Sequence, residues 1–247
     1  MAIQTDQLNL LKKHLSDSYV AHVPSLLHPK TLDEDNRKNI DRAFSAFSLV
    51  YLCGIPIAQA CAAIVDDYDD FGIDAIFYKA DEETLYLVQA KLKAGATFNQ
   101  AEANGFCQGI RKIIKQDYTG FNQHILARQA DIDGALEQCS EIRLVVAHTG
   151  DGISAHAQKA LSDLLVEECQ VEERLKAPII DSDAAWVASA LQGANAYPRI
   201  DTKLTLLTIA PLSLPGSPTM ARCHFLSLLR YISCMTKPYM SATLGTS

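Results

Sequence analysis

The sequence lacks the short motifs that identify several large classes of enzyme. No glycine-rich phosphate-binding loop occurs, and no serine or cysteine stands in a nucleophile motif. None of the seven cysteines forms a CxxC pair, and the seven histidines show no metal-ligand spacing. These absences count against a small-molecule α/β enzyme, a disulfide framework and a zinc site, and we interpret the cysteines as reduced thiols.

Signals for a membrane and for a strong overall charge are also missing. Residues 1–17 are polar and lack the apolar core of a secretory signal, and the longest apolar run, residues 43–60, is interrupted by serines and a Gly-Ile-Pro break. The net charge of −7 gives no whole-protein attraction for nucleic acid, so phosphate binding needs a local basic patch. We therefore expect a cytoplasmic protein with no membrane contact.

Periodic apolar positions predict how the 247 residues fold. Helices are predicted over residues 5–16, 31–53, 57–65, 98–115, 121–137, 154–168 and 181–191. Strands are predicted over residues 73–78, 85–90, 142–147, 178–180 and 202–209. This order predicts an α/β fold, with a mixed central sheet flanked by helices.

Residues 71–93 carry polar side chains inside apolar segments. Two apolar runs flank a polar turn, which predicts a β-hairpin. Asp74 lies inside the first strand, and Gln89 and Lys91 close the second. Because burial of such groups without partners is unfavourable, we expect the three residues to have a use.

The chemistry of these three residues suits a metal. If the two strands pair, Asp74 and Gln89 converge, and their oxygens are hard ligands suited to Mg²⁺ or Mn²⁺. Lys91 lies on the same strand face as Gln89, where it can position a water or offset charge on a phosphoryl group. A metal would lower the pKa of that water and stabilise the developing negative charge. The arrangement predicts catalytic roles for all three residues in phosphodiester hydrolysis.

These residues also carry a resemblance to known families. Asp74, followed by Gln89-Ala90-Lys91 at a strand end, resembles the PD-(D/E)xK nuclease core in its glutamine variant, as in Mrr-type restriction endonucleases. More closely, DDYDDFGIDAIFY followed by LYLVQAKLK resembles the N-terminal part of the abortive infection phage resistance (AIPR) family, over residues 33–115. The resemblance implies a restriction-endonuclease-like fold, a metal-dependent nuclease and a role in bacterial defence against phage.

The resemblance leaves the metal with one acid too few. Gln89 stands where the main nuclease group has a second carboxylate, so another acid must approach Asp74. The candidates are Asp70, on the loop before the first strand, and Asp41 and Glu34 on the second helix.

Basic residues after the hairpin are the candidates for binding nucleic acid, with DNA expected before RNA: Lys93, Arg111, Lys112 and Lys115. A group of this kind on a helix is more often a solvated face.

His148, after the third apolar strand, is either catalytic or a loop histidine without a partner. The sequence leaves open whether the protein forms a homo-oligomer.

Each residue of the site also has a structural explanation. Asp74 can cap a turn or form a salt bridge with Lys91, Gln89 can be an ordinary polar residue of a strand, and Lys91 can be a solvated edge lysine. The acids at positions 66–70 can be a solvated turn. The corresponding function is an inactive nuclease-fold module that binds nucleic acid or a partner protein.

The end of the chain differs in composition from the rest. Residues 211–247 hold no acid and three of the four methionines, so the nuclease-like domain is assigned to residues 1–210. Codons for residues 218–247 can be chosen so that another reading frame resembles the family's downstream segment. We therefore expect a frameshifted, truncated copy of a longer protein; the alternative is a genuine apolar tail that packs on a partner.

Overall fold

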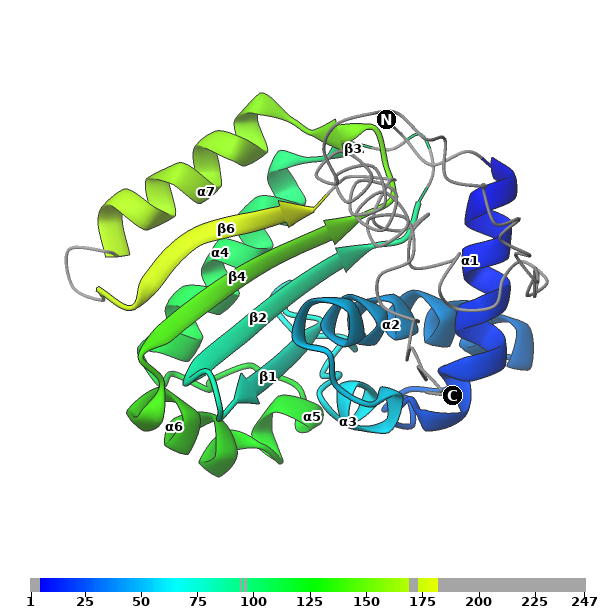
Figure 1. Cartoon of the computed structure of the whole chain (residues 1–247), viewed down its shortest axis with the longest axis horizontal. Coiled ribbons are helices and arrows are strands. Elements are labelled where there is room, and N and C mark those ends of the chain that lie inside the picture. Colours follow the sequence, from blue (N-terminus) through cyan, green and yellow to red (C-terminus); the bar gives the residue numbers. More distant parts are fainter. Residues whose placement is uncertain (1–4, 94, 96, 169–172, 182–247) are drawn as a thin grey trace, which may run out of the picture. The chain divides into compact units, whose positions relative to one another are not determined.

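A central sheet with helices on its faces forms the described part of the chain, residues 5–93, 95, 97–168 and 173–181 of the computed structural model (Figure 1). The α-helices are α1 Thr5–Ser18, α2 Leu32–Cys53, α3 Ile57–Ala62, α4 Gln100–Ile114, α5 Gln123–Leu126, α6 Gln129–Gln138 and α7 Ala155–Glu168, and a 3₁₀ turn covers Val20–His22. The strands are β1 Ala75–Lys79, β2 Thr84–Lys91, β3 Thr97–Phe98, β4 Glu141–His148, β5 Gly152–Ile153 and β6 Leu175–Asp181. The expected mixed α/β architecture is confirmed.

The main sheet has the strand order β1-β2-β4-β6. β1 and β2 form the predicted antiparallel hairpin, with Ile76 opposite Leu87. β4 runs parallel to β2 and to β6. The connection from β2 to β4 contains α4, because parallel neighbours need a long crossover. β3 and β5 form a separate short parallel pair.

The two faces of the sheet are covered by different helices (Figure 1). On one face, Leu87 and Leu144 of the sheet are buried in a core with Phe106 of α4 and Leu161 of α7. α2 lies against the other face, beside β1 and β2. Strand alternation explains the division, since successive side chains of β2 point to opposite faces.

The ends of α2 and α3 set the path of the chain into β1. Thr31 caps α2 through a reciprocal capping box with Glu34, and Gly54, with φ of 65°, ends the helix. α3 ends at Ala62 instead of the predicted residue 65. It stops early because Ile64 leaves the helix to form a β-bridge with Ala75 at the start of β1.

The predicted helix over residues 121–137 is divided into α5 and α6. The division falls at Arg128, whose guanidinium donates hydrogen bonds to the carbonyl oxygens of Ala63 and Ile76, each 3.0 Å away. Asp181 is the last residue of β6, so the predicted helix from 181 does not begin there. The rest of that helix, the strand at 202–209 and the tail at 211–247 lie outside the described residues.

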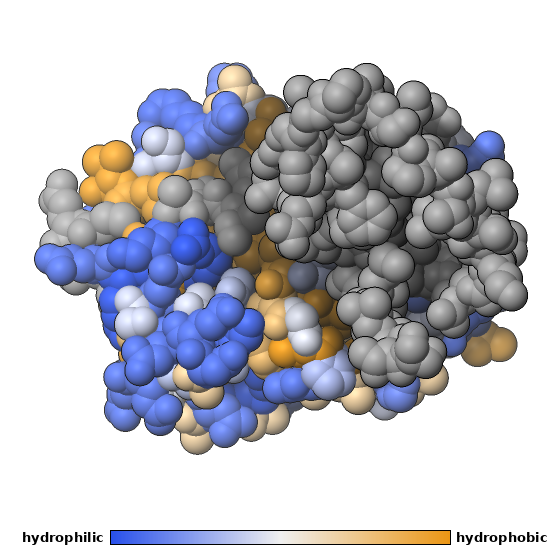
Figure 2. Space-filling model, in the orientation of Figure 1, coloured by the Kyte–Doolittle hydropathy of each residue, from blue (hydrophilic) through white to orange (hydrophobic). Residues whose placement is uncertain are grey.

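Among the described residues, no helix combines the length and the apolar character needed to cross a bilayer. Figure 2 shows hydrophilic residues over much of one described face, with a hydrophobic band between them.

Candidate metal centre

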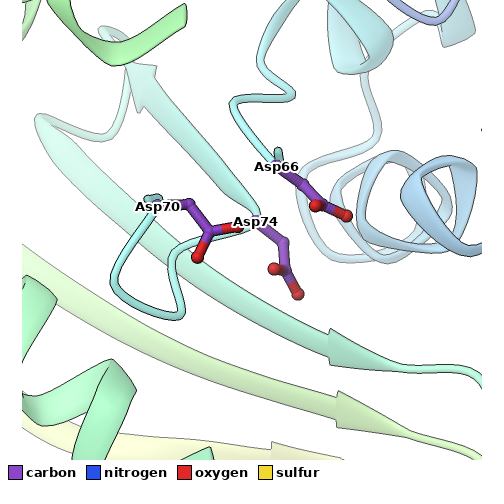
Figure 3. A group of neighbouring side chains, drawn as sticks. All are labelled: Asp66, Asp70 and Asp74. Atoms are coloured by element: carbon purple, nitrogen blue, oxygen red, sulfur yellow. The ribbon is translucent and has the colours of Figure 1, made fainter. Parts of the chain in front are cut away.

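Three carboxylates gather at the start of β1 (Figure 3). Asp66 follows α3, Asp70 lies in the connecting loop, and Asp74 immediately precedes β1. One oxygen from each carboxylate lies within 4.8 Å of the other two. In the part of the chain that the structure describes, these residues form a group with the composition and spacing to hold a metal ion.

Backbone hydrogen bonds fold the loop so that the three acids meet. The Asp66 amide donates to the carbonyl oxygen of Asp74 at 3.1 Å, and the Gly72 amide donates to Asp70 Oδ1 at 2.7 Å. Gly72 has a φ of 73°, and a Cβ there would lie 2.8 Å from the amide nitrogen of Phe106. Only glycine therefore fits this turn against α4, and the turn returns Asp70 towards Asp74.

The three acids disfavour one another's negative charge. Burial, followed by the charge of Asp70, raises the pKa of Asp66 to about 7. Burial raises the pKa of Asp70 to about 6. The pKa of Asp74 is raised well above its usual value by burial and by the charges of Asp66 and Asp70. Near neutral pH the group therefore favours a bound proton or a cation.

Gln89, on the strand paired with β1, is the amide candidate for this site. The register of the hairpin pairs Ala75 with Val88, so Asp74 lies opposite Gln89 one residue further on. Asp74 Oδ2 accepts a hydrogen bond from the amide of Ala90 at 2.5 Å. Gln89 Oε1 is buried and has no hydrogen-bond partner among the described residues. A buried amide oxygen on the strand opposite Asp74 suits a hard cation that takes oxygen ligands.

Lys91 is held by α4 and not by Asp74. Its Nζ lies 2.5 Å from Glu102 Oε1, and the other oxygen of Glu102 accepts a hydrogen bond from the Asn99 amide at 2.8 Å. Among the described residues, no ion pair joins Lys91 to Asp74. The salt-bridge explanation of Asp74 therefore has no geometric support, although the lysine charge still acts to lower the pKa of Asp74.

The three proposed additional acids lie in different places. The structure brings Asp70 to Asp74 and leaves Asp41 and Glu34 outside the acidic group. Glu34 is exposed and accepts a hydrogen bond from Thr31 Oγ1 at 2.7 Å, as part of the α2 cap. Asp41 is exposed on α2.

Asp66 completes the acidic group and was not among the predicted ligands. The sequence offers no signal that separates it from the adjacent Asp67. Asp67 is buried and accepts hydrogen bonds from the Leu27 amide and from Lys38 Nζ, at 2.8 and 2.6 Å. The two neighbours are distinguished only by contacts with distant parts of the chain.

The basic residues on and just after α4 that were predicted to bind nucleic acid form ion pairs with acidic side chains. Arg111 lies 2.6 Å from Glu167 and 3.2 Å from Glu168, both on α7. Ion pairs also place Lys112 2.6 Å from Asp117 and Lys115 3.9 Å from Glu168. Lys93 is exposed after β2. The charges on this helix face are therefore largely offset, as expected for a solvated face.

His148 is the last residue of β4 and does not lie in a loop. It is 1% exposed, stands in register with Lys91 on the neighbouring strand, and has no hydrogen-bond partner for either ring nitrogen among the described residues. Burial lowers the pKa of its imidazole, so the neutral ring is favoured at pH 7.

Comparisons with models of protein families, with curated proteins and with solved structures find no match. The functional interpretation rests on the oxygen-bearing side chains at the start of β1 and the end of β2.

Proposed function

We propose that this domain is a metal-dependent nuclease with a restriction-endonuclease-like (PD-(D/E)xK) core. One observation carries the proposal: oxygens of the Asp66, Asp70 and Asp74 carboxylates lie within 4.8 Å of one another. The buried Gln89 Oε1, on the strand paired with β1, has no hydrogen-bond partner among the described residues, which supports the same site.

The donor set fits Mg²⁺ or Mn²⁺. Asp66, Asp70, Asp74 and Gln89 would hold the ion through oxygen atoms, which both ions accept. When bound, such an ion lowers the pKa of a water and stabilises negative charge on a phosphodiester. Asp66 and Asp70 would supply the charge that the neutral Gln89 does not.

Lys91 would act on the water or on the phosphate. It follows Gln89 by two residues, so both side chains leave the same face of β2. An ammonium at this place orients a water by hydrogen bonding and offsets charge on a phosphoryl oxygen. Glu102 on α4 holds the Lys91 side chain in place through their 2.5 Å ion pair.

The strand order supports the same interpretation. Asp74 immediately precedes the first strand of an antiparallel hairpin, Gln89 and Lys91 lie on the second strand, and α4 lies on the connection to the parallel strand β4. This is the arrangement that the resemblance to the PD-(D/E)xK core implies. The resemblance to the AIPR family extends the proposal to a cytoplasmic role in bacterial defence against phage, with DNA expected before RNA as the substrate.

The second candidate is an inactive nuclease-fold module that binds nucleic acid or a partner protein. The observation in its favour is the ion pair between Lys91 and Glu102. A lysine ammonium that is paired with a carboxylate is less available to act on a water or a phosphate. The neutral Gln89 also leaves one ligand without charge.

Cleavage assays separate the two candidates. The purified protein is incubated with plasmid, single-stranded DNA and RNA, with Mg²⁺, Mn²⁺ or EDTA. We expect metal-dependent cleavage that Asp74→Ala abolishes and that Lys91→Ala lowers by about 100-fold or more, as for a lost acid–base or charge-stabilising group. Asp81→Ala, in the exposed turn of the hairpin, is the matched control.

Two outcomes decide against the nuclease site. Cleavage that survives both Asp74→Ala and Lys91→Ala would show that the reaction occurs elsewhere. Binding of nucleic acid without cleavage in any metal would favour the inactive module.

A further inference from the structure

The loop that supplies the acids also presents an aromatic side chain to solvent. Tyr68 lies midway between Asp66 and Asp70 and is 51% exposed. Lys38 Nζ lies over its ring, 4.5 Å from the centroid. The ring of His28 lies 5.9 Å away at an interplanar angle of 60°. An exposed tyrosine bordered by cationic and aromatic side chains is available for stacking.

Hydrogen bonds to the buried Asp67 side chain hold the backbone at Tyr68. The side chain of Asp67 is 1% exposed, and its Oδ1 accepts hydrogen bonds from the Tyr68 amide at 2.8 Å and from Lys38 Nζ at 2.6 Å. Its Oδ2 accepts from the Leu27 amide at 2.8 Å. The backbone at Tyr68 is thus ordered before any ligand arrives, so a contact with the ring loses little conformational entropy.

Two lysines place positive charge beside the ring. Lys38 contacts the ring directly, and exposed Lys30 is hydrogen-bonded to Tyr68, which raises the pKa of its ammonium. The carboxylates of Glu34 and Asp35 also lie near Lys30, so this surface is not uniformly basic. Aromatic rings interleaved with lysines are the usual elements of single-strand binding, in which bases stack and ammonium groups contact phosphates.

We propose that Tyr68 stacks an unpaired base of single-stranded nucleic acid, with Lys30 and Lys38 contacting the adjacent phosphates. This deepens the proposed nuclease function and rests on it for the position of the scissile bond. Asp66 and Asp70 lie two residues to either side of Tyr68 in the same loop, so a strand held by the ring would run beside the loop that supplies the acids. A duplex holds its bases within its own stack, so single strands are the favoured form.

Binding measurements on the full chain test this proposal. Fluorescence anisotropy is measured in EDTA with labelled single-stranded DNA, single-stranded RNA and duplex DNA of one sequence. Tyr68→Ala is expected to weaken single-strand binding about tenfold, the effect of losing one stacked base. Tyr68→Phe should retain it, and Tyr51→Ala, at a tyrosine 45% exposed on α2, is the matched control.

The salt dependence reports the lysine contact. Lys30→Ala is expected to reduce the slope of log affinity against log salt by about 0.7, the value for one phosphate contact on a single strand. Lys159→Ala, at an exposed lysine of α7, should leave the slope unchanged.

The outcomes distinguish the stacking site from the nuclease. If Tyr68→Ala binds like Tyr51→Ala, or if the wild type binds no single strand, the stacking site is wrong even where plasmid is cleaved. Tyr68-dependent binding without cleavage in any metal would support the stacking site and contradict the nuclease.

A crosslinking experiment avoids dependence on the folding of a variant. The wild-type protein is irradiated with an oligonucleotide that contains 5-iodouracil, and the crosslinked residue is identified by mass spectrometry. A crosslink at Tyr68 is expected, and crosslinks confined to other residues would overturn the proposal.

Discussion

At the scale of single residues, the acidic group is an unfavourable arrangement unless something offsets its charge. Asp66, Asp70 and Asp74 are half-buried and repel one another, and the pKa of each carboxyl is raised. Gln89 Oε1 is buried and has no hydrogen-bond partner in the described part of the chain. A cation bound to the three carboxylates would offset their repulsion.

The raised pKa values predict how stability depends on pH without a metal. Because the pKa of Asp66 is about 7 in the folded chain and about 3.8 unfolded, the folded state binds the extra proton and loses stability as pH rises between these values. Asp66→Asn should therefore raise the melting temperature more at pH 8 than at pH 5, by at least about 2 °C. Thermal unfolding in EDTA measures this difference.

A difference between two variants is needed because other groups act in the opposite direction. Burial lowers the pKa of His14, His124 and His148, so their contribution to stability rises with pH. Asp81→Asn, at an exposed turn, is the matched control for the loss of one carboxylate. An Asp66→Asn effect that is equal at both pH values would contradict the raised pKa.

At the scale of secondary-structure elements, α4 packs against the loop that supplies the acids. Phe106 leaves room only for glycine at position 72, and Glu102 at the start of the helix holds Lys91. Gly109 lets α4 approach the loop closely: a Cβ there would lie 2.6 Å from the carbonyl oxygen of Phe71. One helix therefore positions both the acids and the lysine.

The close approach at Gly109 predicts a large effect of a small substitution. Gly109→Ala should lower the free energy of unfolding by about 1–3 kcal/mol, because the added methyl group also lies 2.8 Å from Ile73 Cγ1. Gly105→Ala, on the same helix with no atom within 4 Å, should be neutral or stabilising by up to about 1 kcal/mol. Urea denaturation compares the two variants. Equal effects would mean that α4 does not pack against the loop at this contact.

At the scale of the whole molecule, a bound cation should stabilise the fold. The acidic group joins the segment that follows α3 to the residue that precedes β1, so an ion there links parts of the chain that separate on unfolding. The net charge of −7 also favours cation binding in general, which makes a site-specific control necessary.

Metal addition should raise the melting temperature. At 100 times the dissociation constant, Mg²⁺ or Mn²⁺ should add about 2.7 kcal/mol, or roughly 5–10 °C for a domain of this size. The shift should be larger at pH 8 than at pH 6, because protons compete for carboxyls whose pKa values are about 6 and 7. Differential scanning fluorimetry measures it.

Asp74→Asn should remove most of this metal-induced shift, and Asp81→Asn should retain it. An equal response in both variants would show that the ion binds outside the acidic group.

Much of the architecture could be predicted because it depends on neighbouring residues. Apolar periodicity identified α2, α4, α7 and the β1–β2 hairpin, since each element shows its buried face in its own sequence. The early end of α3 and the division at Arg128 could not be predicted. Both depend on backbone contacts with β1, which lies far along the chain from Arg128.

The sequence by itself determined the β1–β2 hairpin, because strand alternation and a short turn fix which residues lie opposite each other. Only the tertiary structure decided that Asp66, and not Asp67, joins Asp74, and that Lys91 pairs with Glu102. These choices depend on bridges and helix packing between distant segments, for which no local pattern exists.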